Sequence, residues 1–408
     1  MGEREGPPRR VLLGAFGDPG HAFPMIALGR ALRARGHEVT LQTWRRWERH
    51  VLAEGLRFAP APEYTVFPSG PEPLDFYEAV VHATADTVPL VRELEPEVVV
   101  ADILTLAPAL AAEIVGAPRA TLIPHVHPHG PPEFPIYSLG ARLPRTAAGR
   151  ALWRRVHPIV GRGLERGRVE LNQTRERLGL PPLDHVHGGI SRQLALVATF
   201  PQLEYPRAAP QPNTHVVGPL MWEPPADEVE LPPGREPLVL VAPSTAQDKE
   251  HRLLLAALRG LADAPVRVLA TYNRRLPSAP LPVAENARVV EWVSYARTMP
   301  RCDVVVCHAG HGTLVRALAC GCAVVACPAV GDMNENAARL VWAGAGVRVP
   351  RRFTTPRALR LAVERALAEP SIGARARELE AWAHANDAGA RAAELVERLA
   401  AGTPRAPA

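Results

Sequence analysis

Short runs of aliphatic residues recur along the chain, and each is followed by a stretch in which apolar positions return every three or four residues. The interiors of the runs at 10–16, 97–102 and 303–308 carry almost no polar side chains, which is typical of strands buried on both faces of a sheet. The intervening stretches have the spacing of amphipathic helices. Strands that alternate with helices predict an α/β chain with parallel sheets and right-handed crossovers.

This alternation occurs twice, in two similar halves. In the first half we predict strands at 10–16, 37–43, 56–60, 97–102, 119–124, 194–200 and 215–220, and helices at 25–35, 47–54, 74–94, 104–115 and 150–178, with Pro158 as a candidate break in the last helix. In the second half we predict strands at 238–242, 266–272, 287–293, 303–308 and 322–327, and helices at 249–261, 313–320, from 335, 355–367, 372–384 and 389–400.

A segment without periodicity separates the two halves. Residues 219–237 are rich in proline and acidic side chains, as linkers are. We therefore predict a first domain at 1–218, a second at 238–386 and a terminal helix and tail at 387–408. Two similar α/β domains would face each other across a cleft in which a ligand could bind.

Composition narrows the function classes. The chain has 408 residues, of which 47% are hydrophobic and 22% charged, as in ordinary globular proteins. It contains no apolar run approaching the roughly 18 residues of a membrane span and no apolar signal segment near the N-terminus, so we expect a cytoplasmic protein without a membrane span. The five cysteines lie between Cys302 and Cys327 without paired metal spacing, and we expect them reduced and mostly buried.

The net charge of +5 does not indicate a nucleic-acid partner. Lys249 is the only lysine among 47 basic residues, and the arginines are spread along the chain without a basic block interleaved with aromatics. We therefore expect no nucleic-acid binding. A monomer and a homodimer are both compatible with the sequence.

Two neighbouring loops in the second half carry candidate chemistry. Gly310 and Gly312 lie where the strand at 303–308 enters a helix, and the free amides of such a helix start attract phosphate. The alternative is a tight turn without a ligand. Asp332, Asn334 and Glu335 follow the next strand, at the edge where open α/β sheets bind ligands. One loop could hold a diphosphate and the other a group with hydroxyls.

The segment from Trp292 to Gly346 resembles the nucleotide-sugar signature of the GT-B glycosyltransferases of family 1, close to the actinomycete enzymes that glycosylate natural products. Residues 17–32, GDPGHAFPMIALGRAL, also look like that family's G-H-x-x-P-x-x-x-L segment. The resemblance implies an α/β GT-B fold of two facing Rossmann-like domains with a cleft between them, and a last helix that crosses back onto the first domain. The first loop lacks the full dinucleotide glycine pattern, so NAD is not expected.

The resemblance assigns a catalytic pair. His21, in the first strand–helix loop, matches the family's general base, although by residue type alone it could be a solvent-exposed loop histidine. Asp102 ends a buried strand and matches the acid that orients this histidine. The alternative for Asp102 is a cap on the helix that begins near Thr105.

The resemblance also implies donor-binding residues. His308, the amides of Gly310 and Gly312, and Thr313 would hold the diphosphate, with His311 and Gly312 where the family often has Trp-Asn. Trp292, with Val293 beside it, matches a tryptophan that stacks on the base.

Two further loops complete the expected donor site. Ser244 and Thr245 could reach the phosphates or cap the helix after them. Asp332 and Met333 stand where many members have Asp-Gln, whose side chains bind sugar hydroxyls. Because the amide is lost at Met333, we expect a sugar with fewer hydroxyls, such as a deoxysugar carried on thymidine diphosphate.

The acceptor is expected on the first domain. Candidate contacts are Phe76, His125 and Phe134, in or near the regions 60–73 and 125–145. The alternating histidines in the second region could bind a metal adventitiously, but the family chemistry needs neither a metal nor a cofactor, and we expect none.

The resulting hypothesis is an inverting, metal-independent transfer of a sugar, expected to be a deoxysugar, from a nucleoside diphosphate to a lipophilic small molecule. A catalytically silent GT-B protein that partners an active transferase is the alternative. A sugar-nucleotide epimerase of the same architecture is a third hypothesis, but the first half shows no carboxylate cluster to support it. The sequence leaves open the acceptor, the exact sugar, thymidine against uridine diphosphate, and O-, N- or C-linkage.

Overall fold

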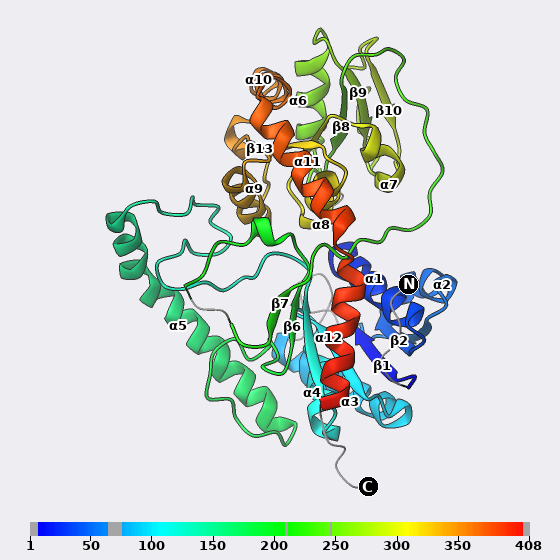
Figure 1. Cartoon of the computed structure of the whole chain (residues 1–408), viewed down its shortest axis with the longest axis vertical. Coiled ribbons are helices and arrows are strands. Elements are labelled where there is room, and N and C mark those ends of the chain that lie inside the picture. The colour runs from blue at the N-terminus through cyan, green and yellow to red at the C-terminus, as the bar shows by residue number, and fades with distance from the viewer. Residues whose placement is uncertain (1–6, 64–75, 209–210, 245–246, 403–408) are drawn as a thin grey trace.

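The computed structural model describes residues 7–63, 76–208, 211–244 and 247–402, and it contains two parallel sheets with helices on both faces (Figure 1). The first sheet has the strand order β3-β2-β1-β4-β5-β6-β7. Its strands are β1 (Arg10–Gly14), β2 (Glu38–Thr43), β3 (Arg57–Pro60), β4 (Val98–Asp102), β5 (Arg119–Ile123), β6 (Ala195–Val197) and β7 (Thr214–Val216).

The second sheet has the order β10-β9-β8-β11-β12-β13. Its strands are β8 (Leu238–Ala242), β9 (Arg267–Thr271), β10 (Ala287–Val290), β11 (Val304–Cys307), β12 (Ala323–Ala326) and β13 (Gly346–Arg348). All strand pairs in both sheets are parallel, as the aliphatic runs predict. The α/β architecture is therefore confirmed.

Helices connect the strands. Those of the first half are α1 (Pro19–Ala34), α2 (Glu48–Ala53), α3 (Phe76–Leu94), α4 (Leu106–Val115) and α5 (Ala147–Arg177), with the short η1 (Arg45–Trp47) and η2 (Pro201–Leu203). Those of the second are α6 (Arg252–Leu261), α7 (Tyr295–Thr298), α8 (His311–Ala319), α9 (Asp332–Ala343), α10 (Pro356–Ala368), α11 (Pro370–Ala385) and α12 (Ala388–Gly402), with η3 (Met299–Arg301) and η4 (Arg351–Phe353).

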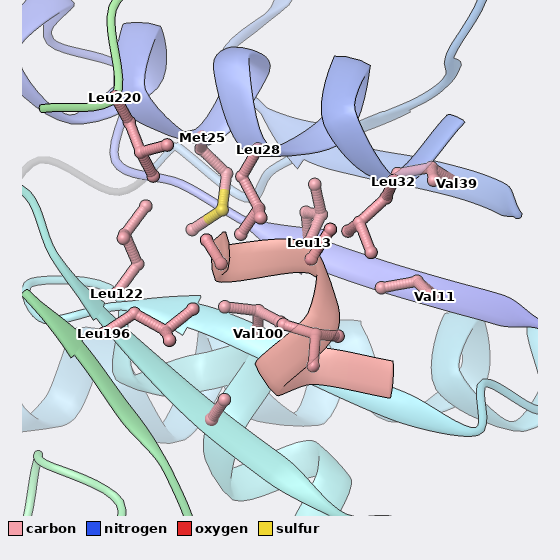
Figure 2. Close-up of a cluster of buried hydrophobic side chains, with 14 of the residues drawn as sticks. Val11, Leu13, Met25, Leu28, Leu32, Val39, Val100, Leu122, Leu196 and Leu220 are labelled. Carbon is pink, nitrogen blue, oxygen red and sulfur yellow. The ribbon is translucent and has the colours of Figure 1, made fainter. Parts of the chain in front are cut away.

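Successive residues of each central strand face opposite helix layers. In β1, Val11 and Leu13 pack under α1 and α12, whereas Leu12 packs with Val91 of α3 and Ala111 of α4. Figure 2 shows the first of these layers, where side chains of α1 meet those of the sheet. Because both faces are covered, the buried positions Val11 to Gly14 of the strand carry no polar side chain, and this explains the aliphatic run in the sequence.

The terminal helix α12 packs on the first sheet although it follows the second in the chain (Figure 1). Glu397 of α12 accepts hydrogen bonds from Arg35 at 2.7 Å and lies 2.6 Å from the ring nitrogen of His37. The chain thus returns to its first domain, although the residue boundaries that we assign to the domains remain predictions.

The starts or courses of several helices differ from the sequence prediction. Helix α1 begins at Pro19 rather than at Met25, so His21 lies in the helix and not in the loop before it. Helix α5 runs through Pro158 without a break, and Pro158 is exposed. Helix α6 begins at Arg252 rather than at Lys249, because His251 has the left-handed φ of 52°. Helices α8 and α9 begin two and three residues earlier than predicted, and Gly331 makes the turn into α9 with a φ of 57°.

The strand order fixes where ligands can bind. Strand β1 lies between β2 and β4 in the first sheet, and β8 lies between β9 and β11 in the second. After β1 the chain continues to the strand on one side, and after β4 it continues to the strand on the other side. The pair β8 and β11 behaves in the same way. In open α/β sheets, ligands bind at the carboxyl ends of such a pair. The segments after β1, β4, β8 and β11 carry His21, Asp102, Ser244 and His308, which are four of the predicted site residues.

Candidate active site

His21 and Asp102 meet at the carboxyl ends of β1 and β4. His21 lies in the first turn of α1, and its Nδ1 is 2.7 Å from Oδ2 of Asp102. The Asp102 side chain is fully buried, and its Oδ1 accepts a hydrogen bond from the amide of Leu104 at 2.8 Å. Helix α4 begins after Thr105 without a side-chain cap, so Asp102 is not its N-cap. The structure brings the two residues together as the resemblance implies.

Electrostatics raise the pKa of His21 above its ordinary value of 6.5. Burial opposes the charged imidazolium, but the charge and hydrogen bond of Asp102 outweigh it, and the carboxylates of Asp18 and Asp332 add to the effect. Asp332 begins α9 in the second domain, so its charge acts on His21 from the other domain.

His308 follows β11, and its orientation is fixed by the neighbouring loop. The amide of Ser244 donates to Nδ1 of His308 at 2.9 Å, so the proton of the neutral ring is on Nε2. The Ser244 hydroxyl accepts from the amide of Gln247 at 3.2 Å and so closes a turn. It does not cap α6, which begins at Arg252 with His251 at the N-cap position. Thr245 lies outside the described residues.

Gly310 and Gly312 form the entrance to α8. A Cβ atom added at either position would meet no described atom within 4 Å, and no side chain of the described residues caps the amides of this helix start. These features suit a ligand that accepts hydrogen bonds. Thr313 is partly buried, and its hydroxyl interacts with that of Tyr295, a contact that the sequence did not indicate.

Trp292 and Val293 follow β10 but have different surroundings. The guanidinium of Arg274 lies 4.8 Å from the ring centroid of Trp292, which is partly exposed and could offer its other face to a base. Val293 is buried in the hydrophobic core, so only its backbone could meet a ligand.

Asp332 and Met333 lie in the first turn of α9 and are partly buried. The buried Asn336, one turn further, donates to the carbonyl of Ala309 at 3.0 Å and to Oδ2 of Asp332 at 3.4 Å. This amide joins the proposed sugar and diphosphate loops. Its position four residues after Asp332, on one helix face, was the available sequence signal.

Among the acceptor candidates, His125 is influenced by the charges of the catalytic pair. Burial lowers the pKa of His125 and the charge of His21 lowers it further, whereas the carboxylates of Asp332 and Asp102 oppose this effect. The hydroxyl of Tyr137, which the sequence did not single out, lies 3.4 Å from its Nδ1. Phe134 instead packs edge-on against Tyr205, with ring centroids 5.7 Å apart. Phe76 begins α3, and its side chain lies outside the described residues.

The alternating histidines pack on one another. Nδ1 of His127 lies 3.0 Å from the carbonyl of His129, whose ring stacks on that of His187. Burial lowers the pKa of His127 to about 4. Within the described ranges, no three His, Cys, Asp or Glu side chains are grouped so that they could hold a metal ion. No helix in the described part of the chain is long and apolar enough to cross a bilayer.

Buried contacts hold the two domains together beside the site. Arg339 of α9 pairs with Glu335 at 2.8 Å and with Glu204 of the first domain at 3.3 Å, and it stacks over the ring of Tyr205. His311 Nε2 lies 3.4 Å from the carbonyl of Ala198. These contacts position α9, and with it Asp332, against the first domain.

Comparison with known proteins identifies the family of the chain. Residues 254–401 match the family model of the erythromycin biosynthesis protein CIII-like C-terminal domain. The 4'-demethylrebeccamycin synthase of Lentzea aerocolonigenes is 30% identical over 424 residues, which cover 96% of this chain and 99% of that protein. The tylactone mycaminosyltransferase of Streptomyces fradiae is 28% identical over 442 residues, covering 97% and 93%.

Solved structures confirm the GT-B fold. The glycotransferase of kitacinnamycin has a TM-score of 0.76 at 22% identity and covers 96% of this chain and 99% of its own. Glycosyltransferase VinC, solved in complex with dTDP, has a TM-score of 0.69 at 22% identity with the same coverage. The fold and the near full-length match to the synthase lead to one conclusion: the chain belongs to the GT-B glycosyltransferase family of actinomycete natural-product biosynthesis, and it is a nucleotide-sugar-dependent glycosyltransferase.

Proposed function

We propose that this enzyme transfers a deoxysugar from thymidine diphosphate to a hydroxyl group of a lipophilic natural product, with inversion at the anomeric carbon. The observation that carries the proposal is the buried His21–Asp102 pair, on which the charge of Asp332 acts from the donor domain. A base and a donor-binding carboxylate at one place suit a reaction between an acceptor and a nucleotide sugar.

The proposed reaction is a single displacement. His21 bonds to Asp102 through Nδ1, so Nε2 is the nitrogen that takes the proton from the acceptor hydroxyl. The acceptor oxygen forms a bond to the anomeric carbon while the bond from that carbon to the phosphate oxygen breaks. The nucleoside diphosphate leaves with the electron pair. Asp102 stabilises the imidazolium that forms, because its carboxylate remains charged beside it.

The leaving diphosphate needs donors near its oxygens. The first amides of α8 and the Nε2–H of His308 are the groups that we assign to it. Hydrogen bonds to a developing anion stabilise the transition state more than the ground state, and so they accelerate transfer.

Met333 supports the choice of a deoxysugar. A sugar hydroxyl left without a partner in a buried site costs about 1–3 kcal/mol, and a thioether packs well against a methyl or methylene group instead. One relative is named a 6-deoxyallosyltransferase, and VinC was solved with dTDP, and both names support this choice. A natural-product acceptor is supported by the name of another relative, a tylactone mycaminosyltransferase.

A donor competition tests the proposal. Thymidine diphosphate deoxysugars and uridine diphosphate glucose would be offered together with one acceptor, and the products quantified by mass spectrometry. We expect the deoxysugar product to dominate, and NMR coupling constants to show an inverted anomeric centre. Transfer of glucose at least as efficient as that of the deoxysugar would refute the donor assignment, and retained configuration would refute the single displacement.

A further inference from the structure

A cavity of about 540 Å³ lies on the side of His308 that faces the start of α6 and the segment after β13. Its walls include His308, Asp248, Arg351, Arg352 and Thr354. Its volume falls within the usual range for small-molecule sites, about 300–1,000 Å³. Neither strand periodicity nor the resemblance assigned a role to the segment 351–354.

His308 presents a hydrogen-bond donor to this cavity. Its Nδ1 already accepts from the amide of Ser244, so Nε2 carries the proton of the neutral ring. Nε2 lies 4.0 Å from Oδ1 of Asp248, a second residue of the cavity wall. Burial lowers the pKa of His308 below its ordinary value. The carboxylate of Asp248 opposes this effect, and the charge of Arg351 adds to it. The ring is therefore a neutral donor at pH 7.

Two exposed arginines face the same cavity without a carboxylate partner among the described residues. Arg351 donates to the carbonyl of Ala329 at 3.4 Å, and the guanidinium of Arg352 lies 4.7 Å from the ring centroid of Phe353. Arg252 also borders the cavity, but it pairs with Glu250 at 2.7 Å. Unpaired guanidinium groups are well suited to phosphate, which they bind through two parallel hydrogen bonds.

Asp248 contributes a second kind of group. It is buried, its Oδ1 accepts from the amide of Leu253 at 3.3 Å, and its Oδ2 has no hydrogen-bond partner among the described residues. Buried polar atoms are nearly always paired, so an orphaned oxygen in a cavity wall indicates a donor supplied by a ligand or solvent. The wall therefore offers cations for a phosphate and an acceptor for a hydroxyl, the groups that a nucleotide carries together.

We infer that Arg351 and Arg352 form the second wall of the diphosphate site. The phosphates of the donor lie between these guanidinium groups and His308. Asp248 can accept a hydrogen bond from a sugar hydroxyl of the nucleoside. This inference rests on the proposed function. The arginines neutralise charge on the departing diphosphate. They bind the leaving group and take no part in deprotonating the acceptor.

Calorimetric binding of thymidine diphosphate, uridine diphosphate and thymidine tests the inference. The proteins are the wild type, Arg351→Gln, Arg352→Gln, the double variant and the control Arg360→Gln, whose side chain pairs with Glu364 on α10. We expect each single variant to bind both diphosphates about tenfold more weakly, as for the loss of one charge-assisted hydrogen bond, and the double variant to lose more. Thymidine binding should be equal in all five proteins, because thymidine has no phosphate.

The outcomes separate this inference from the function on which it rests. If the wild type binds neither diphosphate, the proposed donor class fails and the inference fails with it. If the wild type binds a diphosphate and the double variant binds it equally well, the arginines have no contact with phosphate and only the inference is overturned. Both arginines are exposed, so unchanged melting temperatures without ligand will show that the variants fold normally.

Discussion

Replacing Asp102 with asparagine tests the role of the buried pair without removing volume. The substituted side chain would keep an oxygen to accept from the Leu104 amide, so the turn after β4 should hold. Its NH₂ group, however, would face Nδ1 of His21 in place of a carboxylate oxygen that now lies at 2.7 Å. Two donors cannot share that contact, so the histidine proton would move to Nε2, and the nitrogen that must accept the proton would lose its lone pair.

The expected loss can be bounded from the geometry. A hydrogen bond to a charged group contributes about 1.5–3 kcal/mol, which corresponds to a factor of roughly 10–150 in rate. The pair is shielded from solvent, with the His21 and Asp102 side chains 17% and 0% exposed, so little of this is lost to screening. The wrong tautomer adds to the loss, because general-base catalysis itself contributes about 10²–10⁴-fold. We therefore expect turnover to fall by about 10²–10⁴-fold with an unchanged melting temperature.

The pH profile provides an independent signature. The basic form of His21 is the active one, so activity should fall as the pH drops through its pKa, which Asp102 holds above the ordinary value against the effect of burial. Removing the Asp102 charge leaves burial as the main influence on the pKa of His21, which should then fall. The acidic side of the pH profile, where activity is lost, should move to lower pH. The assay is kcat/KM between pH 5 and 9 for both proteins. Normal turnover with no movement of the acidic side of the profile would refute the catalytic role, and a lowered melting temperature with normal turnover would show a purely structural role.

Three further predictions concern the donor and the fold. Trp292→Ala and His308→Ala should each weaken thymidine diphosphate binding by about tenfold, since stacking and charge-assisted contacts contribute about 1–3 kcal/mol; unchanged calorimetric affinity would remove that residue from the site. Met333→Gln should shift donor preference toward glucose in the competition assay, and no shift would show that the side chain does not face the sugar. Glu397→Gln should destabilise the protein by about 3 kcal/mol in urea titrations at pH 7, because the substitution removes the carboxylate charge that pairs with Arg35. Hydrogen bonding to Arg35 lowers the pKa of Glu397 below 4.5 despite burial, so this contribution exists above pH 4.5 and is lost as the pH falls through the lowered pKa. An equal difference in the free energy of unfolding between the wild type and Glu397→Gln at pH 7 and at pH 3 would contradict the role assigned to this carboxylate.

The sequence predicted the sheets well because their strands are covered on both faces. A buried parallel strand such as β11 must be apolar at every position, so Val304 to Cys307 is conspicuous in the sequence. Helix starts were harder to predict. Asp332 is typical of a loop, but the left-handed turn at Gly331 lets α9 begin there. His251 shows the opposite case, where a left-handed residue delays α6, and no pattern of apolar positions reports a backbone angle.

The candidate site was predictable where a residue follows directly from a strand end. Asp102 ends β4 and His308 directly follows β11, and parallel strands bring such ends to one edge of their sheet. Residues that reach the site from far along the chain gave no such signal. Tyr137 lies in a long irregular loop, and Arg351 lies beyond an edge strand, so only the folded chain places them beside His125 and His308.

The most direct test of the central claim is the release of nucleoside diphosphate from a thymidine diphosphate deoxysugar, measured with and without a panel of lipophilic hydroxyl-bearing aglycones, for the wild type and His21→Ala. We predict that the wild type releases the diphosphate and forms a glycoside with at least one aglycone. His21→Ala should bind the donor with wild-type affinity and transfer about 10²–10⁴-fold more slowly. Wild-type turnover by His21→Ala would contradict the account, because the acceptor would then be deprotonated by another group.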